Sequence, residues 1–246
     1  MALIHSFETS GNKLFRYRGQ IPTVLFLLAI PVIYYTDYAK IADNLSLFLT
    51  IVAIVLSVVG FSIRAYAIGT TPKGTSGRNT KEQVAEILNV SGIYSVVRHP
   101  LYLGNYLMWA GITTFTFNLY FFLLVSLVFW LYYERIMFAE ERFLERKFGD
   151  EYLLWSKKVP AFIPALVRFK KSTIRFSFKI ILKREYSGIL ATTFGFAFVD
   201  LLRTYFTQHT FEWQRISVYA VVIATVLSII LRILKHSSML NEEGRS

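Results

Sequence analysis

The sequence predicts an all-α integral membrane protein, a helical bundle with about six transmembrane helices. Of its 246 residues, 54% are hydrophobic, and the mean hydropathy is +0.44. Charged residues make up only 17% of the chain, whereas soluble domains usually carry about 25%. Several apolar stretches reach the roughly 20 residues that a helix needs to cross a hydrocarbon core of ~30 Å. These observations exclude an ordinary soluble domain.

Five apolar stretches account for the six predicted helices. They are Ile21–Tyr38, Leu45–Ile68, Leu101–Phe138, Ser187–Phe206 and Ile216–Leu234. The third stretch is too long for one helix and long enough for two, and Asn118 near its middle predicts the turn of a tight helical hairpin. The fourth is the least apolar because Asp200 and Arg203 lie near its end, so an interfacial helix or a re-entrant segment is the alternative there.

The chain divides into three predicted parts. Residues 1–70 hold the first two transmembrane helices. Residues 71–168 form a core with a polar loop, the helical hairpin and a charged helix, which Pro160 and Pro164 end. Residues 169–246 hold a basic segment and the last two helices. That basic segment, Phe169–Arg184, suits either an interfacial helix on anionic lipid or a solvated linker.

Basic residues predict the orientation of the chain in the membrane. Lys13, Arg16 and Arg18 precede the first apolar stretch, and further Lys and Arg residues gather in every second connection. Because such residues stay on the cytoplasmic side, we expect both termini and residues 69–100 to face the cytoplasm. Anionic lipid headgroups then explain the net charge of +11. No recognition module accompanies the charge, which argues against nucleic acid as a partner.

Several kinds of catalytic site are excluded by the residues that the chain lacks. There are no cysteines, which rules out disulfides and thiolate nucleophiles. No glycine-rich phosphate loop and no serine nucleophile elbow occurs. The four histidines are scattered, so we expect no metal site.

The densest polar motif, residues 92–105, lies just before the predicted hairpin and contains Arg98, His99 and Tyr102. Pro100 suits the first turn of a helix, where a missing N–H costs little. The free N–H groups of that helix start, beside His99 and Arg98, would bind a carboxylate or phosphate well. The alternative is that these side chains are ordinary interfacial anchors.

A second group of charged residues follows the hairpin. Glu134 and Arg135 lie at the end of an apolar stretch, where ionisable groups are costly unless they are functional or near the surface. Glu140 and Glu141 follow further along the same predicted helix. The alternative is a solvated helix face with charge pairs between successive turns.

Taken in order, these motifs resemble the isoprenylcysteine carboxyl methyltransferase family. They also resemble the wider group of membrane methyltransferases that includes phospholipid N-methyltransferases. The matching pieces are Ser91–Tyr94, Arg98–Gly104, Glu140–Leu144, Phe148-Gly149, Tyr152 and Val159–Pro164. Together they cover about residues 75–165.

The resemblance implies a site for S-adenosylmethionine without a Rossmann domain, in a cytoplasm-facing pocket that a lipophilic acceptor enters from the bilayer. The implied cofactor contacts are Glu86, Ile87, Leu88, Asn89, Tyr94, His99, Pro100, Leu101, Tyr102 and Glu140. Asn79 corresponds to a further polar contact upstream. The family has an arginine about one helical turn before the paired glutamates, where this chain has Ile136 with Arg135 beside it.

The chemistry that the resemblance implies is methyl transfer, for which an enzyme mainly supplies position and a dry site. A carboxylate or phosphate acceptor needs no general base, whereas an amine would need one, with Glu134 or Glu141 as candidates. Arg98 or Arg135 would orient an anionic acceptor. Three acceptors remain open: an isoprenylcysteine-like carboxylate, a lipid phosphate and an aminophospholipid headgroup.

Two other function classes are alternatives. One is an NADPH-dependent reductase of a lipophilic substrate on the same membrane architecture. The other is a non-enzymatic transporter or scaffold, which would carry paired broken helices in two halves of the chain. The sequence contains a single loop of that kind, which favours the enzyme.

Overall fold

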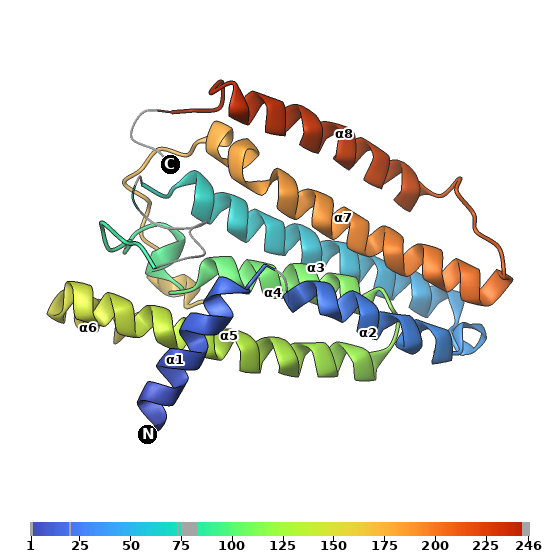
Figure 1. The fold of residues 1–246 in the computed structure, drawn as a ribbon, viewed down its shortest axis with the longest axis horizontal. Coiled ribbons are helices and arrows are strands. Elements are labelled where there is room, and N and C mark those ends of the chain that lie inside the picture. Colours follow the sequence, from blue (N-terminus) through green and yellow to red (C-terminus); the bar gives the residue numbers. More distant parts are fainter. Residues whose placement is uncertain (1, 20, 73, 75–82, 243–246) are drawn as a thin grey trace.

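The structure is a computed structural model that describes residues 2–19, 21–72, 74 and 83–242. These residues form a bundle of α-helices, which confirms the predicted fold class (Figure 1). The helices are α1 Leu3–Arg16, α2 Ile21–Tyr35, α3 Asp43–Gly69, α4 Pro100–Thr114, α5 Leu119–Phe148, α6 Asp150–Ser156, α7 Phe178–Gln208 and α8 Ile216–His236. The described chain contains no strand, and an isolated bridge joins Gly92 and Lys170.

Four helices, α3, α5, α7 and α8, are long and apolar enough to cross a membrane. The two other predicted spans form shorter helices, since α2 and α4 have 15 residues each. At 1.5 Å per residue such a helix is ~22 Å long, which is less than a hydrocarbon core of ~30 Å. Hydropathy predicted where these two helices lie but overestimated the first one's length.

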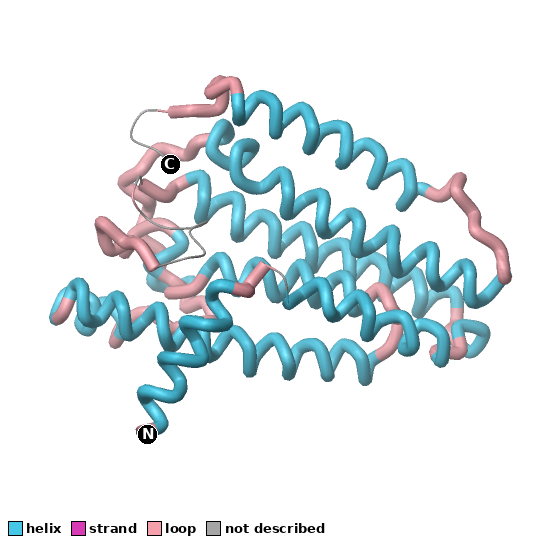
Figure 2. The backbone as a smooth tube through the Cα atoms, in the orientation of Figure 1, coloured by secondary structure: helices cyan, strands magenta, loops and turns pink. Residues whose placement is uncertain are grey.

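The bundle has two ends, where the loops gather (Figure 2). We call one of them the loop end; it holds residues 83–99 and 157–177 and the start of α7. The other, the hairpin end, holds the turns at residues 115–118 and 209–215. The polar motif of residues 92–105 therefore lies at the loop end, beside the long loops rather than the tight turns.

The predicted turn at Asn118 is confirmed. The Asn118 side chain accepts a hydrogen bond from the backbone N–H of Phe121 at 2.9 Å and so caps the start of α5. Its amide also donates to the Thr36 hydroxyl at 2.9 Å. Phe117, just before it, has a positive φ of 58°. The cap and this residue reverse the chain between α4 and α5.

Small residues bring α3 and α4 into close contact. A Cβ atom built on Gly60 would lie 2.6 Å from the carbonyl oxygen of Gly104, and one built on Gly104 would lie 2.7 Å from that of Gly60. Between membrane helices, such glycine contacts allow the backbones to pack closely. The contact fixes the start of α4 against the end of α3, which positions Arg64 beside the polar motif.

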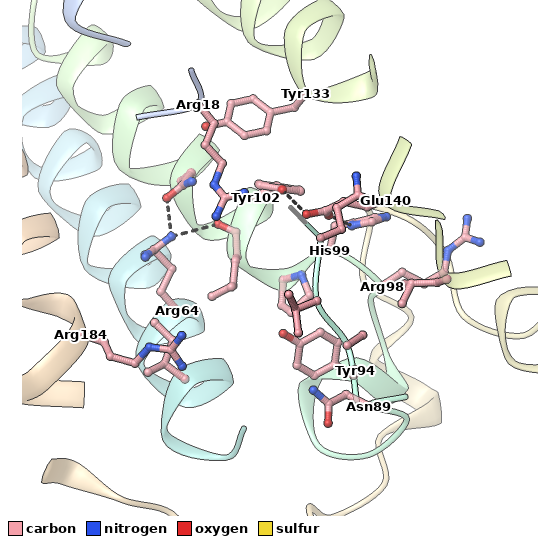
Figure 3. Close-up of a pocket in the computed structure, with 18 of the residues that line it drawn as sticks. Arg18, Arg64, Asn89, Tyr94, Arg98, His99, Tyr102, Tyr133, Glu140 and Arg184 are labelled. Atoms are coloured by element: carbon pink, nitrogen blue, oxygen red, sulfur yellow. Dashed lines mark hydrogen bonds and ion pairs between the residues drawn. The ribbon is translucent and has the colours of Figure 1, made fainter. Parts of the chain in front are cut away.

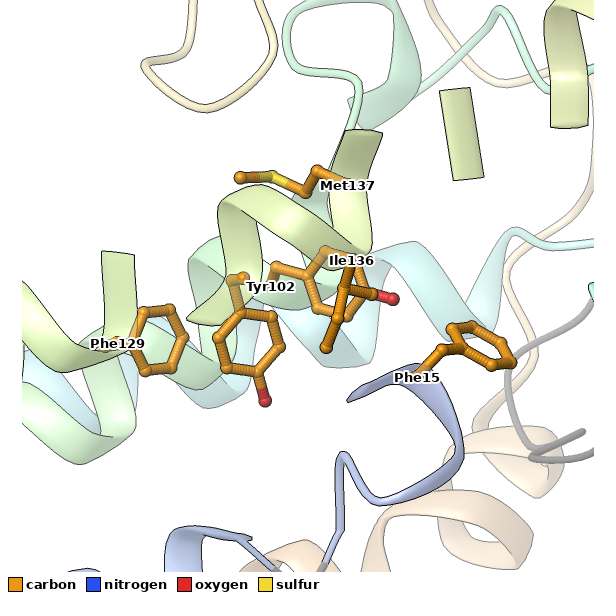
Figure 4. Close-up of a cluster of buried hydrophobic side chains, with 6 residues drawn as sticks. Phe15, Tyr102, Phe129, Ile136 and Met137 are labelled. Atoms are coloured by element: carbon orange, nitrogen blue, oxygen red, sulfur yellow. The ribbon is translucent and has the colours of Figure 1, made fainter. Parts of the chain in front are cut away.

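An apolar cluster joins α1, α4 and α5 (Figure 4). Its buried members are Phe15, Tyr102, Phe129, Tyr133, Ile136 and Met137. Ile136 is fully buried in it. The position where the resemblance noted in the sequence would place an arginine therefore carries an apolar side chain that packs in the core.

Two segments differ from the sequence prediction. The amphipathic helix α1 was not predicted, although its residues Lys13 and Arg16 were noted for their charge. The basic segment Phe169–Arg184 was predicted to be either an interfacial helix or a linker, but the structure divides it into two parts. Its residues 169–177 form no α-helix, and its residues 178–184 form the first turns of α7.

Candidate active site

A cavity of about 360 Å³ opens at the loop end, bounded by α3, α4, α5, α7, residues 83–89 and the two residues Arg18 and Gly19 that follow α1 (Figure 3). Nine of the ten predicted cofactor contacts line it: Ile87, Leu88, Asn89, Tyr94, His99, Pro100, Leu101, Tyr102 and Glu140. Glu86 does not line it, and its backbone N–H donates to the carbonyl of Gly74 at 3.0 Å. Asn79 lies outside the described residues.

His99 lies at the start of α4, where Pro100 occupies the first helical turn as predicted. Its ring is 6% exposed and has a glutamate at each nitrogen: Nε2 lies 2.8 Å from Glu141 Oε1 and Nδ1 lies 3.6 Å from Glu140 Oε2. Burial opposes the charged form, but the hydrogen bonds and charges of Glu140 and Glu141 outweigh it and raise the pKa of His99. His99 is therefore a buried ring between two carboxylates that favour its charged form.

Tyr102 holds Glu140 at the wall of the cavity. The tyrosine hydroxyl donates to Glu140 Oε1 at 2.7 Å (Figure 3). The Tyr102 ring is stacked with His99 at a centroid separation of 5.8 Å. These contacts join the beginning of α4 to the charged end of α5, two motifs that the chain separates by a whole helical hairpin.

The segment that ends the predicted charged helix supports the backbone of the site. The N–H groups of Arg98 and His99 donate to the carbonyls of Pro160 at 2.9 Å and Ala161 at 3.1 Å. The N–H of Ala165 returns a bond of 2.9 Å to the Val96 carbonyl. The segment that contains Pro160 thus fixes Arg98 and His99, the two residues before α4, through backbone hydrogen bonds.

Tyr94 forms part of the cavity wall and is fixed through its own backbone. Its carbonyl accepts a hydrogen bond of 3.2 Å from the Trp155 indole, which α6 carries. Burial raises the pKa of Tyr94 to about 12, so the hydroxyl stays neutral at physiological pH. Tyr94 therefore offers the cavity an aromatic face and an uncharged hydroxyl.

The four predicted catalytic residues are not all at the cavity. Arg98 lines it and forms an ion pair of 3.3 Å with Glu141, which lies behind His99. Glu134, Arg135 and Glu141 are absent from the lining. The Arg135 guanidinium packs over the Phe7 ring of α1, 3.2 Å from its centroid. Its observed contact is therefore with the N-terminal helix.

Several lining residues were missed in the sequence. They are Arg18, Gly19, Arg64, Asn105, Tyr133, Arg184, Glu185, Ser187 and Gly188, among others. Arg64 had a readable signal, because an ionisable residue inside an apolar stretch is often functional. Arg18 had only its place in a basic cluster, and Arg184 and Glu185 had none, since they lie in a basic stretch of ambiguous character.

Arg64 and Glu185 form a buried, bidentate ion pair between α3 and α7. Arg64 Nε lies 2.7 Å from Glu185 Oε2, and Nη2 lies 2.6 Å from Oε1. The remaining Arg64 nitrogen donates to Asn105 Oδ1 on α4 at 2.6 Å. Glu185 is 1% exposed. The pair therefore fixes three helices around the cavity.

A comparison with known families bears on this arrangement. Residues 45–151 match the family model described as phospholipid methyltransferase. The resemblance seen in the motifs is confirmed over this segment. It runs from α3 through the loop and α4 to α6, and it therefore includes the walls that carry His99, Tyr102 and Glu140.

Curated relatives match a similar part of the chain. A protein-S-isoprenylcysteine O-methyltransferase of Schizosaccharomyces pombe is 37% identical over 87 residues, which are 35% of this chain and 37% of that protein. The enzyme of the same name from Saccharomyces cerevisiae is 30% identical over 116 residues, 47% of this chain and 48% of that protein. No solved structure matches the chain.

A bacterial relative carries a different kind of name. The nickel-cobalt-cadmium resistance protein NccN of Alcaligenes xylosoxydans is 32% identical over 98 residues, 40% of this chain and 43% of that protein. In the described part of this chain, no three His, Cys, Asp or Glu side chains are grouped to hold a metal ion. The chain spans less than half the length of each of these three relatives.

Proposed function

We propose that the chain is a membrane methyltransferase that uses S-adenosylmethionine to methylate a lipid or prenylated acceptor. The observation that carries the proposal is that nine of ten residues expected to contact the methyl donor line one cavity. Its volume of about 360 Å³ is in the range of small-molecule sites, which is roughly 300–1,000 Å³.

The lining suits the parts of this donor. The start of α4 beside His99 favours a carboxylate, because helix N–H groups lie there next to a ring whose pKa is raised toward the charged form. The Glu140 carboxylate suits an amino group or ribose hydroxyls. Ile87, Leu88 and Tyr94 provide apolar and aromatic surface for an adenine ring.

Bound S-adenosylmethionine supplies an activated methyl group, and the chain supplies position and a site shielded from water. The two glutamates beside His99 are already engaged, Glu140 by Tyr102, and Glu141 by His99 and Arg98. Neither is therefore well placed as a general base. This favours a carboxylate or phosphate acceptor over an amine, since such an acceptor has no proton to lose.

The acceptor class follows from the membrane helices and from the relatives. Three of the four candidate spans, α3, α5 and α7, contribute residues to the cavity, which favours an acceptor with an apolar chain. Two yeast relatives are named for O-methylation of isoprenylcysteine. We extend this to the present chain as a lipophilic acceptor with a terminal acid, at a site that the positive-inside rule assigns to the cytoplasm.

Calorimetric titration of the purified full chain with S-adenosylhomocysteine tests the donor site. We expect binding by wild type and a loss of about tenfold or more for Glu140→Gln, since a charge-assisted hydrogen bond contributes roughly 1.5–3 kcal/mol. The matched control is Glu151→Gln, an exposed glutamate on α6. Absence of binding by folded wild type would refute the proposal.

A further inference from the structure

We infer that residues 160–171, called the 160–171 segment below, form a contact with the surface of the bilayer. Its exposed apolar side chains enter the leaflet, and the basic side chains beside them meet anionic lipid headgroups. The segment lies at the loop end, between α6 and α7 and outside the four candidate spans (Figure 1). The contact does not depend on the reaction that the chain catalyses, so it is independent of the proposed function.

The segment exposes large apolar side chains although no spanning helix includes it. The exposed fraction is 80% for Ile163, 74% for Leu166 and 102% for Val167. Phe169 is exposed as well. Single apolar residues on a surface are common, but several together mark a contact with a membrane or with another protein.

Contacts with α4 and α5 place the segment at the boundary of the membrane. The Phe162 ring packs edge-on against Trp130 of α5, with centroids 5.6 Å apart, and against Tyr106 of α4 at 5.9 Å. Trp130 lies one helical turn before Glu134, where the apolar part of α5 ends. Tryptophan and tyrosine gather at the level of the lipid headgroups. The residues next to Phe162 therefore lie where the hydrocarbon core meets the headgroups.

The backbone of the segment is bound to the loop before α4, which gives its side chains a defined place. The carbonyls of Pro160 and Ala161 accept hydrogen bonds from the two residues before α4. Near the other end, the Lys170 N–H donates to the Ser95 hydroxyl at 2.8 Å, and the Lys170 carbonyl accepts from the Gly92 N–H at 2.8 Å. The exposed apolar side chains lie between these two fixed points.

The charge of the region selects a leaflet with anionic lipid as the partner. Between Glu151 and Glu185 the chain has nine Lys and Arg residues and no Asp or Glu. Five of the basic residues lie in or just before the segment and are exposed: Lys157, Lys158, Arg168, Lys170 and Lys171. Basic side chains near a membrane surface are attracted to anionic headgroups. A second copy of the chain would instead bring the same positive surface, and like charges repel.

The first test measures the depth of the segment with single cysteines, since the chain has none of its own. The full chain with Ile163→Cys or Val167→Cys carries an environment-sensitive fluorophore and is placed in phosphatidylcholine nanodiscs. Quenching by a lipid with a spin label near the top of its acyl chain is compared with quenching by aqueous iodide. The control is Glu151→Cys, an exposed position on α6 beyond the charged end of α5.

We expect the lipid quencher to act about threefold or more as strongly as iodide at positions 163 and 167, because interfacial apolar groups enter the headgroup and acyl boundary. Iodide should be the stronger quencher at position 151. Stronger quenching by iodide at either segment position would overturn the inference, since the segment would then face water. Protection from both quenchers would also overturn it, because another protein chain, including a second copy, would then cover the surface.

The second test addresses the headgroups. Two lipids with the same acyl spin label, one with a phosphatidylserine and one with a phosphatidylcholine headgroup, are compared at equal mole fraction. We expect the anionic lipid to quench the fluorophore of Val167→Cys about twofold more strongly. Adding Lys170→Gln and Lys171→Gln should remove most of this preference, whereas adding Lys147→Gln, an exposed lysine near the end of α5, should keep it.

Equal quenching by the two lipids would overturn the assignment of anionic headgroups, as would an undiminished preference after both lysine substitutions in the segment. None of these outcomes alters the proposed function, which the titration with S-adenosylhomocysteine tests separately.

Discussion

His99 joins the two motifs that the sequence analysis singled out. It lies at the start of α4, and its two ring nitrogens face Glu140 and Glu141 near the end of α5. The sequence predicted that these residues share a site but assigned Glu141 a possible role as a base. The structure shows that this carboxylate contacts the His99 ring at 2.8 Å.

The raised pKa of His99 predicts a pH dependence of stability. Burial opposes the charge, but Glu140 and Glu141 outweigh it, so the pKa lies above the ordinary 6.5. A group whose pKa is raised on folding stabilises the fold fully below its unfolded pKa and loses that contribution as pH rises through the folded pKa. In detergent, the melting temperature of wild type should therefore exceed that of His99→Gln at pH 6, and the difference between the two should narrow toward alkaline pH.

A difference in melting temperature between wild type and His99→Gln that stays constant over this pH range would mean that His99 is neutral in the folded protein. Tyr205→Phe on α7 is a suitable control, since it removes a polar group at the far end of that helix. Its effect on the melting temperature should not vary with pH over the same interval.

At the scale of the element, α3 is the helix on which the site is assembled. Glycine contacts hold it against α4, and the Arg64–Glu185 pair holds it against α7. The apolar lengths of α3 and α8 could be read from the sequence because hydropathy alone determines them. The pairing of Arg64 with Glu185 could not, because 121 residues separate them and only the folded bundle brings them together.

The glycine contact between α3 and α4 predicts a steric effect. Gly60→Val should destabilise the protein by about 1–3 kcal/mol, since the new side chain would meet the Gly104 backbone and overpack the interface. Ser62→Val, on an exposed position of the same helix, should have little effect. Urea-induced unfolding in mixed micelles compares the two, and equal stability of the variants would contradict the close packing.

The buried pair predicts a second, non-additive effect. Glu185→Gln leaves the Arg64 charge without its carboxylate and should cost about 3–5 kcal/mol. Arg64→Met combined with Glu185→Leu removes both charges and should restore much of that loss. The same unfolding measurement applies. A double variant less stable than Glu185→Gln would show that the pair is not the source of the effect.

For the whole molecule, the site belongs to one end of the bundle, where the long loops and the start of α7 meet (Figure 1). The motifs that line most of the cavity could be located in the sequence, because they are local and their order is specific. It did not show that α7 and the residues just after α1 complete the cavity. Those contributions depend on how the helices pack, which a hydropathy profile does not contain.

The predicted orientation of the chain in the membrane can be tested with single introduced cysteines, because the chain has no cysteine of its own. A single cysteine in Lys157→Cys, at the loop end, should react with an impermeant maleimide only from the cytoplasmic side. Gln214→Cys, at the hairpin end, should react only from the opposite side. Labelling of intact cells and of inverted membrane vesicles distinguishes the two. A reversed pattern would overturn the predicted orientation of the site.

The most direct test of the central claim is transfer of a labelled methyl group from S-adenosylmethionine to membrane lipids or lipidated proteins in vesicles that contain the full chain. The account predicts label in the lipid-extractable or prenylated fraction with wild type and with Glu151→Gln, and a loss of at least tenfold with Glu140→Gln, which corresponds to about 1.4 kcal/mol or more. Equal labelling by wild type and Glu140→Gln, or none above vesicles that lack the protein, would contradict it.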